Sequence, residues 1–176
     1  TKGRTFSAIE LLGGEFDEIS AFRQGQFATV YLSPRDYHRV HMPVDGTLIA
    51  MTHIPGRLFS VNHQTSQHIP SLFARNERVA CFFETPFGPM AVVFVGAMLV
   101  ASIVTNWHGV VSPPTRQQIR HWDYLTAQQQ YFDKGQEIGY FKFGSTVIIL
   151  LPQNVSFDQA LTKDSQVQMG QKLAVY

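Results

Sequence analysis

Residues 78–95 read RVACFFETPFGPMAVVFV, and this stretch decides the fold. Arg78–Glu84 and Met90–Val95 are apolar runs rich in β-branched and aromatic residues, which favour β-strands. Between them, Thr85–Pro89 contains the prolines and the glycine that are typical of a turn. We therefore predict a β-hairpin whose apolar runs must be covered on both faces.

Further strands are expected on either side of this hairpin. Phe27–Leu32 and Thr47–Ile54 have strand-forming composition and are bounded by turn residues. Met98–Val104 is predicted to add a third strand to the hairpin in an antiparallel meander. Ile138–Leu151, interrupted by glycine, predicts two strands that meet at a tight turn near Gly144.

The amino-terminal part is predicted to form short helices. Ser7 and Glu10 have the spacing of a capping box, and the apolar residues after them end at Gly13. Phe16–Phe22 carries apolar residues at helical spacing, whereas the polar stretch Thr115–Lys134 is expected to be a surface excursion. The expected fold is therefore mainly β, of the α+β type, in one domain that spans residues 1–176.

Composition excludes several classes of function. Hydrophobic residues make up 44% of the chain and charged residues 15%, so a packed core is expected rather than disorder. A net charge of +1 argues against nucleic-acid binding. Cys81 has no partner for an internal disulfide and is expected to be buried. The apolar stretch Met90–Val104 is shorter than the roughly 20 residues that a membrane-spanning helix needs.

Two histidines follow a predicted strand in the segment DYHRVHMP. His38 and His41 are three residues apart, which allows them to converge if the backbone turns there. Histidine is well suited to proton transfer near neutral pH. Two alternatives are that both are surface or capping residues, and that they bind zinc together with His63, although no cysteine pair or His-Glu motif accompanies them.

A second candidate for chemistry is the segment Gly144–Thr146. A Gly-Ser-Thr sequence is most often a turn that leads into a strand, but the peptide bond between a glycine and a serine can also undergo self-cleavage. The hydroxyl of Ser145 can attack the carbonyl of Gly144 and form an ester, because glycine has no side chain to block the approach. Elimination then leaves a dehydroalanine, which hydrolyses to a pyruvoyl group. Elsewhere, Phe59–His63 and Phe73–Arg78 could be ordinary turns. The arginines of the second segment either form exposed salt bridges or grip a phosphate or carboxylate.

Taken together, these segments resemble the bacterial phosphatidylserine decarboxylases. The resemblance extends from near the amino terminus to Leu173–Val175, and its motifs are highly specific in combination and order. They are YLSPRDYHRVHMP (31–43), LFSVNH (58–63), LFARNER (72–78), FGPM (87–90) and GQEIGYFKFGSTV (135–147).

The resemblance implies a fold, a reaction and a set of site residues. The fold is a biotinyl/lipoyl-like β-barrel or sandwich core. His41 acts as the base for self-cleavage between Gly144 and Ser145, which gives a β chain of residues 1–144 and an α chain of residues 145–176. Ser145 becomes a covalent pyruvoyl group, so no separate cofactor is needed. That group forms a Schiff base with phosphatidylserine, and His38 protonates the carbanion that yields phosphatidylethanolamine.

In the family, a triad aspartate assists the base, and the resemblance places it upstream of residue 1. Neither Asp36 nor Asp45 is expected to replace it. We therefore expect an unprocessed or poorly processed form. For a full-length protein the resemblance implies a peripheral position on the cytoplasmic face of the bacterial membrane, with the printed segment itself soluble. The number of protomers is left open, a homodimer included.

Two other functions are kept as alternatives. In a non-catalytic, lipoyl-like carrier or binding domain, Ser145 would be a plain turn residue and a change at His41 would have no effect. In a serine hydrolase that uses Ser145 and His41, acylating reagents would label the serine without breaking the chain.

Overall fold

The protein is described from a computed structural model of the chain. It describes residues 7–14, 17–61, 65, 68–98, 102–113, 117–125, 129–142 and 144–175. Of Ser145, the backbone alone is described.

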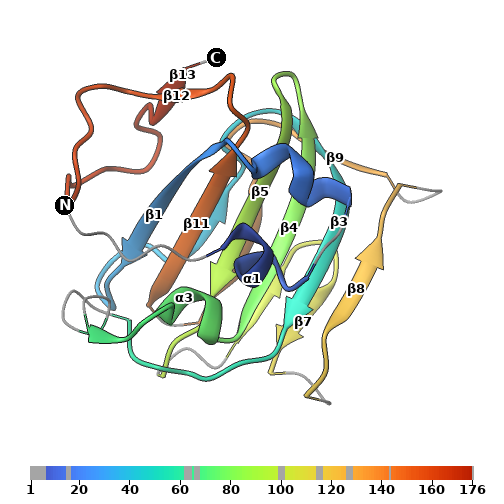
Figure 1. Cartoon of the computed structure of the whole chain (residues 1–176), viewed down its shortest axis with the longest axis vertical. Helices are drawn as coiled ribbons and strands as arrows, with labels where there is room; N and C mark the ends of the chain where they lie inside the picture. Colours follow the sequence, from blue (N-terminus) through green and yellow to red (C-terminus); the bar gives the residue numbers. More distant parts are fainter. Residues whose placement is uncertain are drawn as a thin grey trace.

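A seven-stranded antiparallel sheet forms the centre of the molecule (Figure 1). Along the sheet the order is β1–β11–β5–β4–β3, and both β8 and β9 pair with the outer edge of β3. The strands are β1 (Gln26–Leu32), β11 (Ser145–Leu151), β5 (Gly88–Val95), β4 (Arg78–Thr85), β3 (Gly46–Ile54), β8 (Arg120–Asp123) and β9 (Gln130–Phe132). The predicted hairpin is confirmed as β4 and β5, which pair from Arg78 opposite Val95 to Thr85 opposite Gly88.

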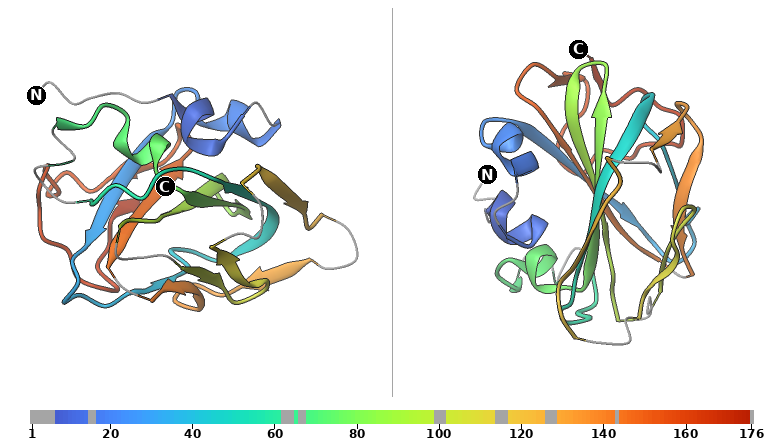
Figure 2. Two further views of the ribbon diagram at one scale, coloured as in Figure 1. Left: turned by 90° about the horizontal axis from the view of Figure 1, so that it is seen from below. Right: turned by 90° about the vertical axis from the view of Figure 1, so that its right-hand side faces the viewer.

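A second, four-stranded sheet packs on one face of the first. Its order is β2–β10–β6–β7, with bounds Arg39–His41, Glu137–Phe141, Ile103–Thr105 and Gly109–Ser112. A short separate pair, β12 (Ser156–Phe157) and β13 (Ala174–Val175), lies near the carboxyl end. The right-hand view of Figure 2 shows the small sheet on one side of the large sheet and the helices on the other.

The helices cover the opposite face of the large sheet (Figure 1). They are α1 (Ala8–Leu12), the 3-10 helix η1 (Asp17–Phe22) and α3 (Leu72–Arg75). The predicted capping box is present, since Ser7 accepts a hydrogen bond from the backbone and Glu10 bonds back to the backbone of Ser7. Gly13 ends α1 in the left-handed region at φ 92°, which favours glycine. No helix within the described residues is long and apolar enough to cross a membrane.

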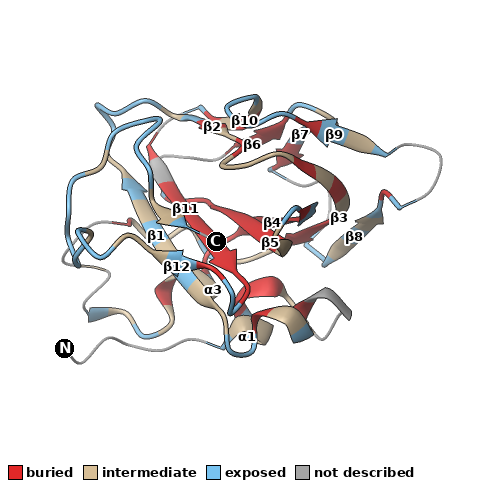
Figure 3. Ribbon diagram, turned by 90° about the horizontal axis from the view of Figure 1, so that it is seen from above, coloured by how far each residue is buried: buried red, intermediate tan, exposed pale blue. Residues whose placement is uncertain are grey.

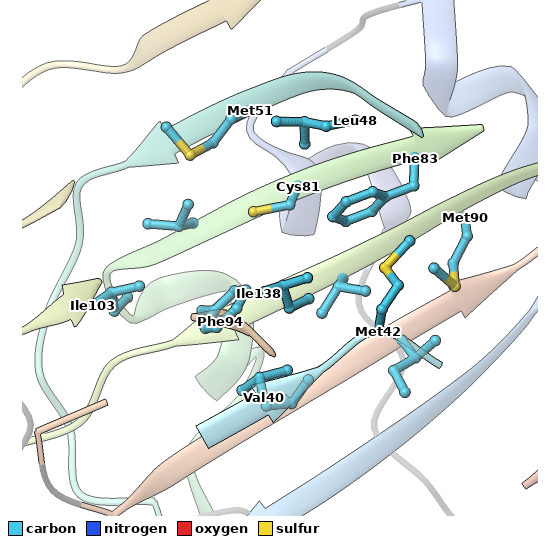
Figure 4. Close-up of a cluster of buried hydrophobic side chains, with 14 of the residues drawn as sticks. Val40, Met42, Leu48, Met51, Cys81, Phe83, Met90, Phe94, Ile103 and Ile138 are labelled. Carbon is cyan, nitrogen blue, oxygen red and sulfur yellow. The ribbon is translucent and has the colours of Figure 1, made fainter. Parts of the chain in front are cut away.

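Alternation along β4 explains why its central part, Val79–Phe83, is apolar without interruption. Val79, Cys81 and Phe83 face the core between the two sheets, whereas Ala80 and Phe82 face the core beneath the helices. Figure 3 shows buried positions on both the large and the small sheet, and Figure 4 shows Met51, Cys81 and Phe83 across from Val40, Ile103 and Ile138. Cys81 is fully buried as predicted, and burial raises the pKa of its thiol. The prediction of a mainly β fold with short amino-terminal helices is therefore confirmed.

The expectation of a meander formed with Met98–Val104 was wrong. Strand β6 begins at Ile103 and pairs with β10 and β7 in the small sheet, while β11 pairs with β5. Local composition can predict that a segment forms a strand, but which strand it pairs with depends on packing between distant parts of the chain. The two strands predicted within Ile138–Leu151 are present as β10 and β11, and they belong to different sheets.

The stretch Thr115–Lys134 was expected to be a surface excursion, and no strand was predicted within it. This segment contains β8 and β9, which both extend the large sheet beyond β3. Both strands are at an edge and are partly exposed, so their composition is more polar than that of the central strands.

Candidate active site

The chain passes from the small sheet to the large sheet just before Ser145. Strand β10 ends at Phe141 and β11 begins at Ser145, which lies opposite Leu32 of β1. Gly144 is buried there, and a β-carbon at this position would lie 3.1 Å from the backbone nitrogen of Pro34. A close approach between the crossing segment and the turn that follows β1 therefore favours glycine here.

His38 lies directly against this crossing. Its Nε2 is 3.2 Å from the backbone nitrogen of Gly144 and 3.3 Å from the carbonyl oxygen of Pro34. The carbonyl of His38 accepts a hydrogen bond from Phe141 at 3.0 Å, which fixes the backbone on the same side. His38 and Gly144 are 106 positions apart in sequence, and the fold brings them into contact.

The two contacts of His38 suit different protonation states of the same atom. An N–H group only donates, so the contact with Gly144 requires an unprotonated Nε2. A carbonyl only accepts, so the contact with Pro34 requires a proton on Nε2. Nε2 of His38 therefore has a backbone partner both when it holds a proton and when it has given the proton away.

Asp36 closes the turn that presents His38. Its carboxylate accepts a hydrogen bond from the backbone nitrogen of Ser33 at 2.7 Å, and its own backbone nitrogen donates to the carbonyl of Ser33 at 2.9 Å. This arrangement is typical of an aspartate that stabilises a turn. Its described contacts thus give Asp36 a local structural role.

His41 lies on β2, opposite Glu137 of β10. Its Nδ1 is 2.7 Å from the carbonyl oxygen of Gly135, and its Nε2 is 2.8 Å from the hydroxyl of Tyr37. Since the carbonyl can only accept, Nδ1 carries the proton, and Nε2 of the neutral ring is the basic nitrogen. The carboxylate of Asp45 accepts a hydrogen bond from the backbone nitrogen of Lys134 at 2.7 Å. This bond supports the turn that presents the carbonyl of Gly135.

Among the residues that the structure describes, His38 rather than His41 contacts Gly144. The contact expected between His41 and the hydroxyl of Ser145 lies outside the described residues. The alternative zinc site included His63, which is also outside them. Within the described part of the chain, no group of three histidine, cysteine, aspartate or glutamate residues is placed to hold a metal ion.

Three consecutive buried polar residues, Asn76 to Arg78, lie at the end of the large sheet where β11 begins. Arg78 of β4 and Thr146 of β11 both pair with Val95 of β5, so the three strands are level at this end. The side chain of Asn76 bonds the backbone of Phe59 and the carbonyl of Gly96. The amide of Asn76 therefore links the LFSVNH segment to the strand beside β11.

Glu77 forms a second part of this polar run. Its carboxylate accepts hydrogen bonds from Nε2 of His53, at 3.2 Å, and from the hydroxyl of Ser112. Burial acts to raise the pKa of Glu77, but these two hydrogen bonds and the electrostatic attraction of His53 hold it below its ordinary value. His53 and Ser112 were not singled out by the sequence, since the only signal was a charged residue at the start of an apolar strand.

Arg78 reaches the opposite face of the sheet. Its guanidinium donates to the carbonyl oxygens of Leu11 at 2.6 Å and Glu10 at 2.5 Å, and thus binds helix α1. Burial lowers the pKa of Arg78 to about 10. The two roles considered for this arginine, a surface salt bridge or a phosphate grip, are replaced by a buried structural one. Arg75 is exposed and lies over the ring of Phe59, 4.9 Å from its centroid.

Comparison with known proteins finds relatives along nearly the whole chain. Residues 1–175 match the profile of the family described as phosphatidylserine decarboxylase. The phosphatidylserine decarboxylase proenzyme of Methylococcus capsulatus is 56% identical over 173 residues, which cover 98% of this chain and 60% of that protein. The proenzyme of Pseudomonas fluorescens strain Pf0-1 is 55% identical over 175 residues, covering 98% of this chain and 61% of that protein.

The chain therefore spans about three fifths of the length of the curated relatives that it matches. The match nevertheless includes both histidines, the turn that presents them and the Gly144–Ser145 crossing. On this similarity along nearly its whole length, the chain belongs to the phosphatidylserine decarboxylase family.

Proposed function

We propose that the protein decarboxylates phosphatidylserine to phosphatidylethanolamine with a pyruvoyl group that it makes from Ser145. The observation that carries this proposal is the contact between His38 Nε2 and the backbone of Gly144. It puts a group able to hold or release a proton beside the bond that would break. The names of the relatives as proenzymes support a chain that is cleaved to become active.

Self-cleavage is proposed to begin with the hydroxyl of Ser145. The oxygen adds to the carbonyl carbon of Gly144, and the peptide nitrogen leaves with a proton, so that the amide becomes an ester. Loss of the α-proton of residue 145 then expels the Gly144 carboxylate and leaves a dehydroalanine. Its imine form takes up water and releases ammonia, which gives a β chain of residues 1–144 and an α chain that starts with the pyruvoyl group.

His41 is proposed to be the base in this reaction. Its Nδ1 donates to Gly135, so the free electron pair of the neutral ring is on Nε2. A fixed tautomer with one basic nitrogen is what general-base catalysis by histidine requires. The backbone carbonyl thus orients the ring within the described part of the chain.

His38 is proposed to act in the mature enzyme. The pyruvoyl carbonyl supplies a sink for the electrons that remain when carbon dioxide leaves the substrate. His38 then delivers the proton that replaces the lost carboxylate, and Nε2 is the atom that holds it. The neighbouring carbonyl of Pro34 stabilises the protonated form, and the N–H of Gly144 stabilises the form that has released its proton.

A peripheral position on an anionic membrane is proposed as well, on the cytoplasmic face of the bacterial membrane. Tyr31, Tyr37 and Met98 are exposed, and so are Arg35 and Lys142. Tyr31 pairs with Thr146 at the start of β11, Met98 follows the end of β5 at the same end of the sheet, and Lys142 lies just before β11. Such aromatic and cationic side chains favour a lipid interface.

Met98→Asp in the full-length protein should weaken cosedimentation with phosphatidylserine vesicles several-fold. An equal loss in Met169→Asp, at another exposed methionine, would contradict this placement.

Intact mass under denaturing conditions tests the proposed chemistry. The full-length protein should give two fragments, with the smaller one starting at residue 145 and blocked to amino-terminal sequencing. Ser145→Ala should remain one chain, whereas Ser156→Ala, a change at an exposed serine of β12, should be cleaved like the wild type.

His41→Ala should slow cleavage by several orders of magnitude, as the loss of a base does in comparable triads. His38→Ala should lose most of its decarboxylation turnover, and this is to be measured on protein that has already been cleaved. A wild-type chain that stays intact would contradict the proposal. Labelling of Ser145 by an acylating reagent in that intact chain would favour a serine hydrolase instead.

A further inference from the structure

We propose that Tyr37 is a positioning residue for self-cleavage. Its ring orients the imidazole of His41, and its hydroxyl occupies the basic nitrogen until the Ser145 hydroxyl displaces it. This inference rests on the proposed function, in which His41 is the base.

The protonation state of His41 follows from its two contacts. The carbonyl of Gly135, 2.7 Å from Nδ1, can only accept a hydrogen bond, so the proton of the neutral ring is on Nδ1. The hydroxyl of Tyr37, 2.8 Å from Nε2, therefore donates to the free electron pair. The base and the group that occupies it are thus identified by the chemistry of their partners.

The ring of Tyr37 makes a separate contact with the same imidazole. The two ring centroids are 5.6 Å apart, and the ring planes are inclined by 27°, which is a stacked arrangement. Tyr37 is 52% exposed, so it contributes little to either hydrophobic core. Its principal described contact is therefore with His41, through the hydroxyl and through the ring face.

The two contacts predict opposite effects on the rate of cleavage. Nε2 has one electron pair, so it cannot accept from Tyr37 and from Ser145 together. The serine must replace the tyrosine hydroxyl before its proton can be taken, and this exchange slows the reaction. The stacked ring, in contrast, keeps the imidazole in place and speeds the reaction.

Two substitutions separate the hydroxyl from the ring. Tyr37→Phe keeps the stacked ring and removes the donor, so the rate constant of chain cleavage should rise roughly three- to tenfold, as expected from the net worth of one hydrogen bond. Tyr37→Ala removes both and should lower the rate constant. Tyr131→Phe, at an exposed tyrosine of β9, is the matched control and should have no effect.

The measurement follows the newly synthesised full-length protein by pulse-chase and denaturing electrophoresis. A Tyr37→Phe rate equal to or below that of the wild type would overturn the role of the hydroxyl. Because a purely structural role would move both variants in the same direction, a decrease in both also contradicts the proposal.

A second measurement does not depend on cleavage. In the full-length Ser145→Ala protein with ¹⁵N-labelled histidine, the ring resonances of His41 should report a proton on Nδ1, and Tyr37→Phe should shift the Nε2 resonance towards that of a free imidazole. Tyr131→Phe should leave it unchanged. A proton on Nε2, or no shift in Tyr37→Phe, would sink the inference. If the wild type does not cleave but these resonances behave as expected, the proposed function fails while the Tyr37–His41 contact stands.

Discussion

The carboxylate of Glu77 is held inside the protein by donors from two different sheets. His53 belongs to β3 of the large sheet, and Ser112 ends β7 of the small sheet. All three side chains are buried. A buried carboxylate is tolerated only when hydrogen bonds replace the water that it has lost, so this residue also joins the sheets beside the candidate site.

Removal of one donor should therefore destabilise the fold. Ser112→Ala leaves the carboxylate with fewer hydrogen bonds and should lower the free energy of unfolding by about 1–3 kcal/mol. Ser156→Ala, at an exposed serine, should change the free energy by less than about 0.5 kcal/mol. Chemical denaturation measures both values, and equal effects in the two variants would contradict this role of Ser112.

The same carboxylate predicts how stability depends on pH. The folded state lowers the pKa of Glu77 below its ordinary value of 4.5, so the ionised group stabilises the fold above that pH. This contribution is lost as the pH falls through the pKa of the folded state. The difference in unfolding free energy between the wild type and Glu77→Gln should therefore be largest near neutral pH and should shrink below pH 4.5. A difference that stays constant with pH would contradict the prediction.

At the scale of single elements, β10 depends on a glycine that allows β6 to come close. A β-carbon at Gly139 would lie 2.4 Å from the carbonyl oxygen of Val104 and 3.3 Å from the ring of Phe94. The neighbouring oxygen belongs to the backbone of a paired strand, so it cannot move aside as a flexible side chain could. This glycine therefore lets the small sheet pack on the large one.

Gly139→Ala should consequently cost about 3 kcal/mol of unfolding free energy, because the two strands must move apart. Gly170→Ala is a useful comparison, since that glycine has a left-handed φ of 81° but nothing near its missing β-carbon. Gly170→Ala should lower the free energy of unfolding by about 1 kcal/mol, through backbone strain alone. Urea denaturation of both variants tests the difference, and a smaller loss for Gly139→Ala would argue against the close approach.

At the scale of the whole molecule, β11 is the element that self-cleavage would affect most. It pairs with β1 from Ser145 to Leu151 on one side and with β5 from Thr146 to Leu150 on the other. The side chains from Thr146 onward along the strand are buried in the two cores. The proposed break precedes this strand and changes only its first residue, which loses its backbone N–H when it becomes the pyruvoyl group, so the pairing from Thr146 to Leu151 is kept.

The two chains should therefore remain associated after cleavage. Native mass spectrometry should show one species with the summed mass of both fragments, and denaturing conditions should separate them. High salt should not release the α chain, because backbone hydrogen bonds and apolar burial, rather than surface charge, hold it. Release of the smaller fragment in native buffer would show that β11 is less firmly held than its pairing implies.

The features that depend on neighbouring residues could be predicted from the sequence. The hairpin of β4 and β5 follows from two apolar runs around a turn, and α1 follows from its capping box and terminal glycine. The histidines and the Gly144–Ser145 bond could be singled out as candidates from their residue types, and the resemblance, whose family the profile supports, implied their roles. Such signals are local or are carried by specific motifs.

Tertiary structure alone decided which distant groups meet. It put β10 and β11 in different sheets and, among the described residues, placed His38 rather than His41 against Gly144. It also turned polar residues 120–123 and 130–132 into edge strands on β3. The physical reason is that strand pairing and side-chain contacts over such separations depend on how the whole core packs, which short-range patterns do not encode.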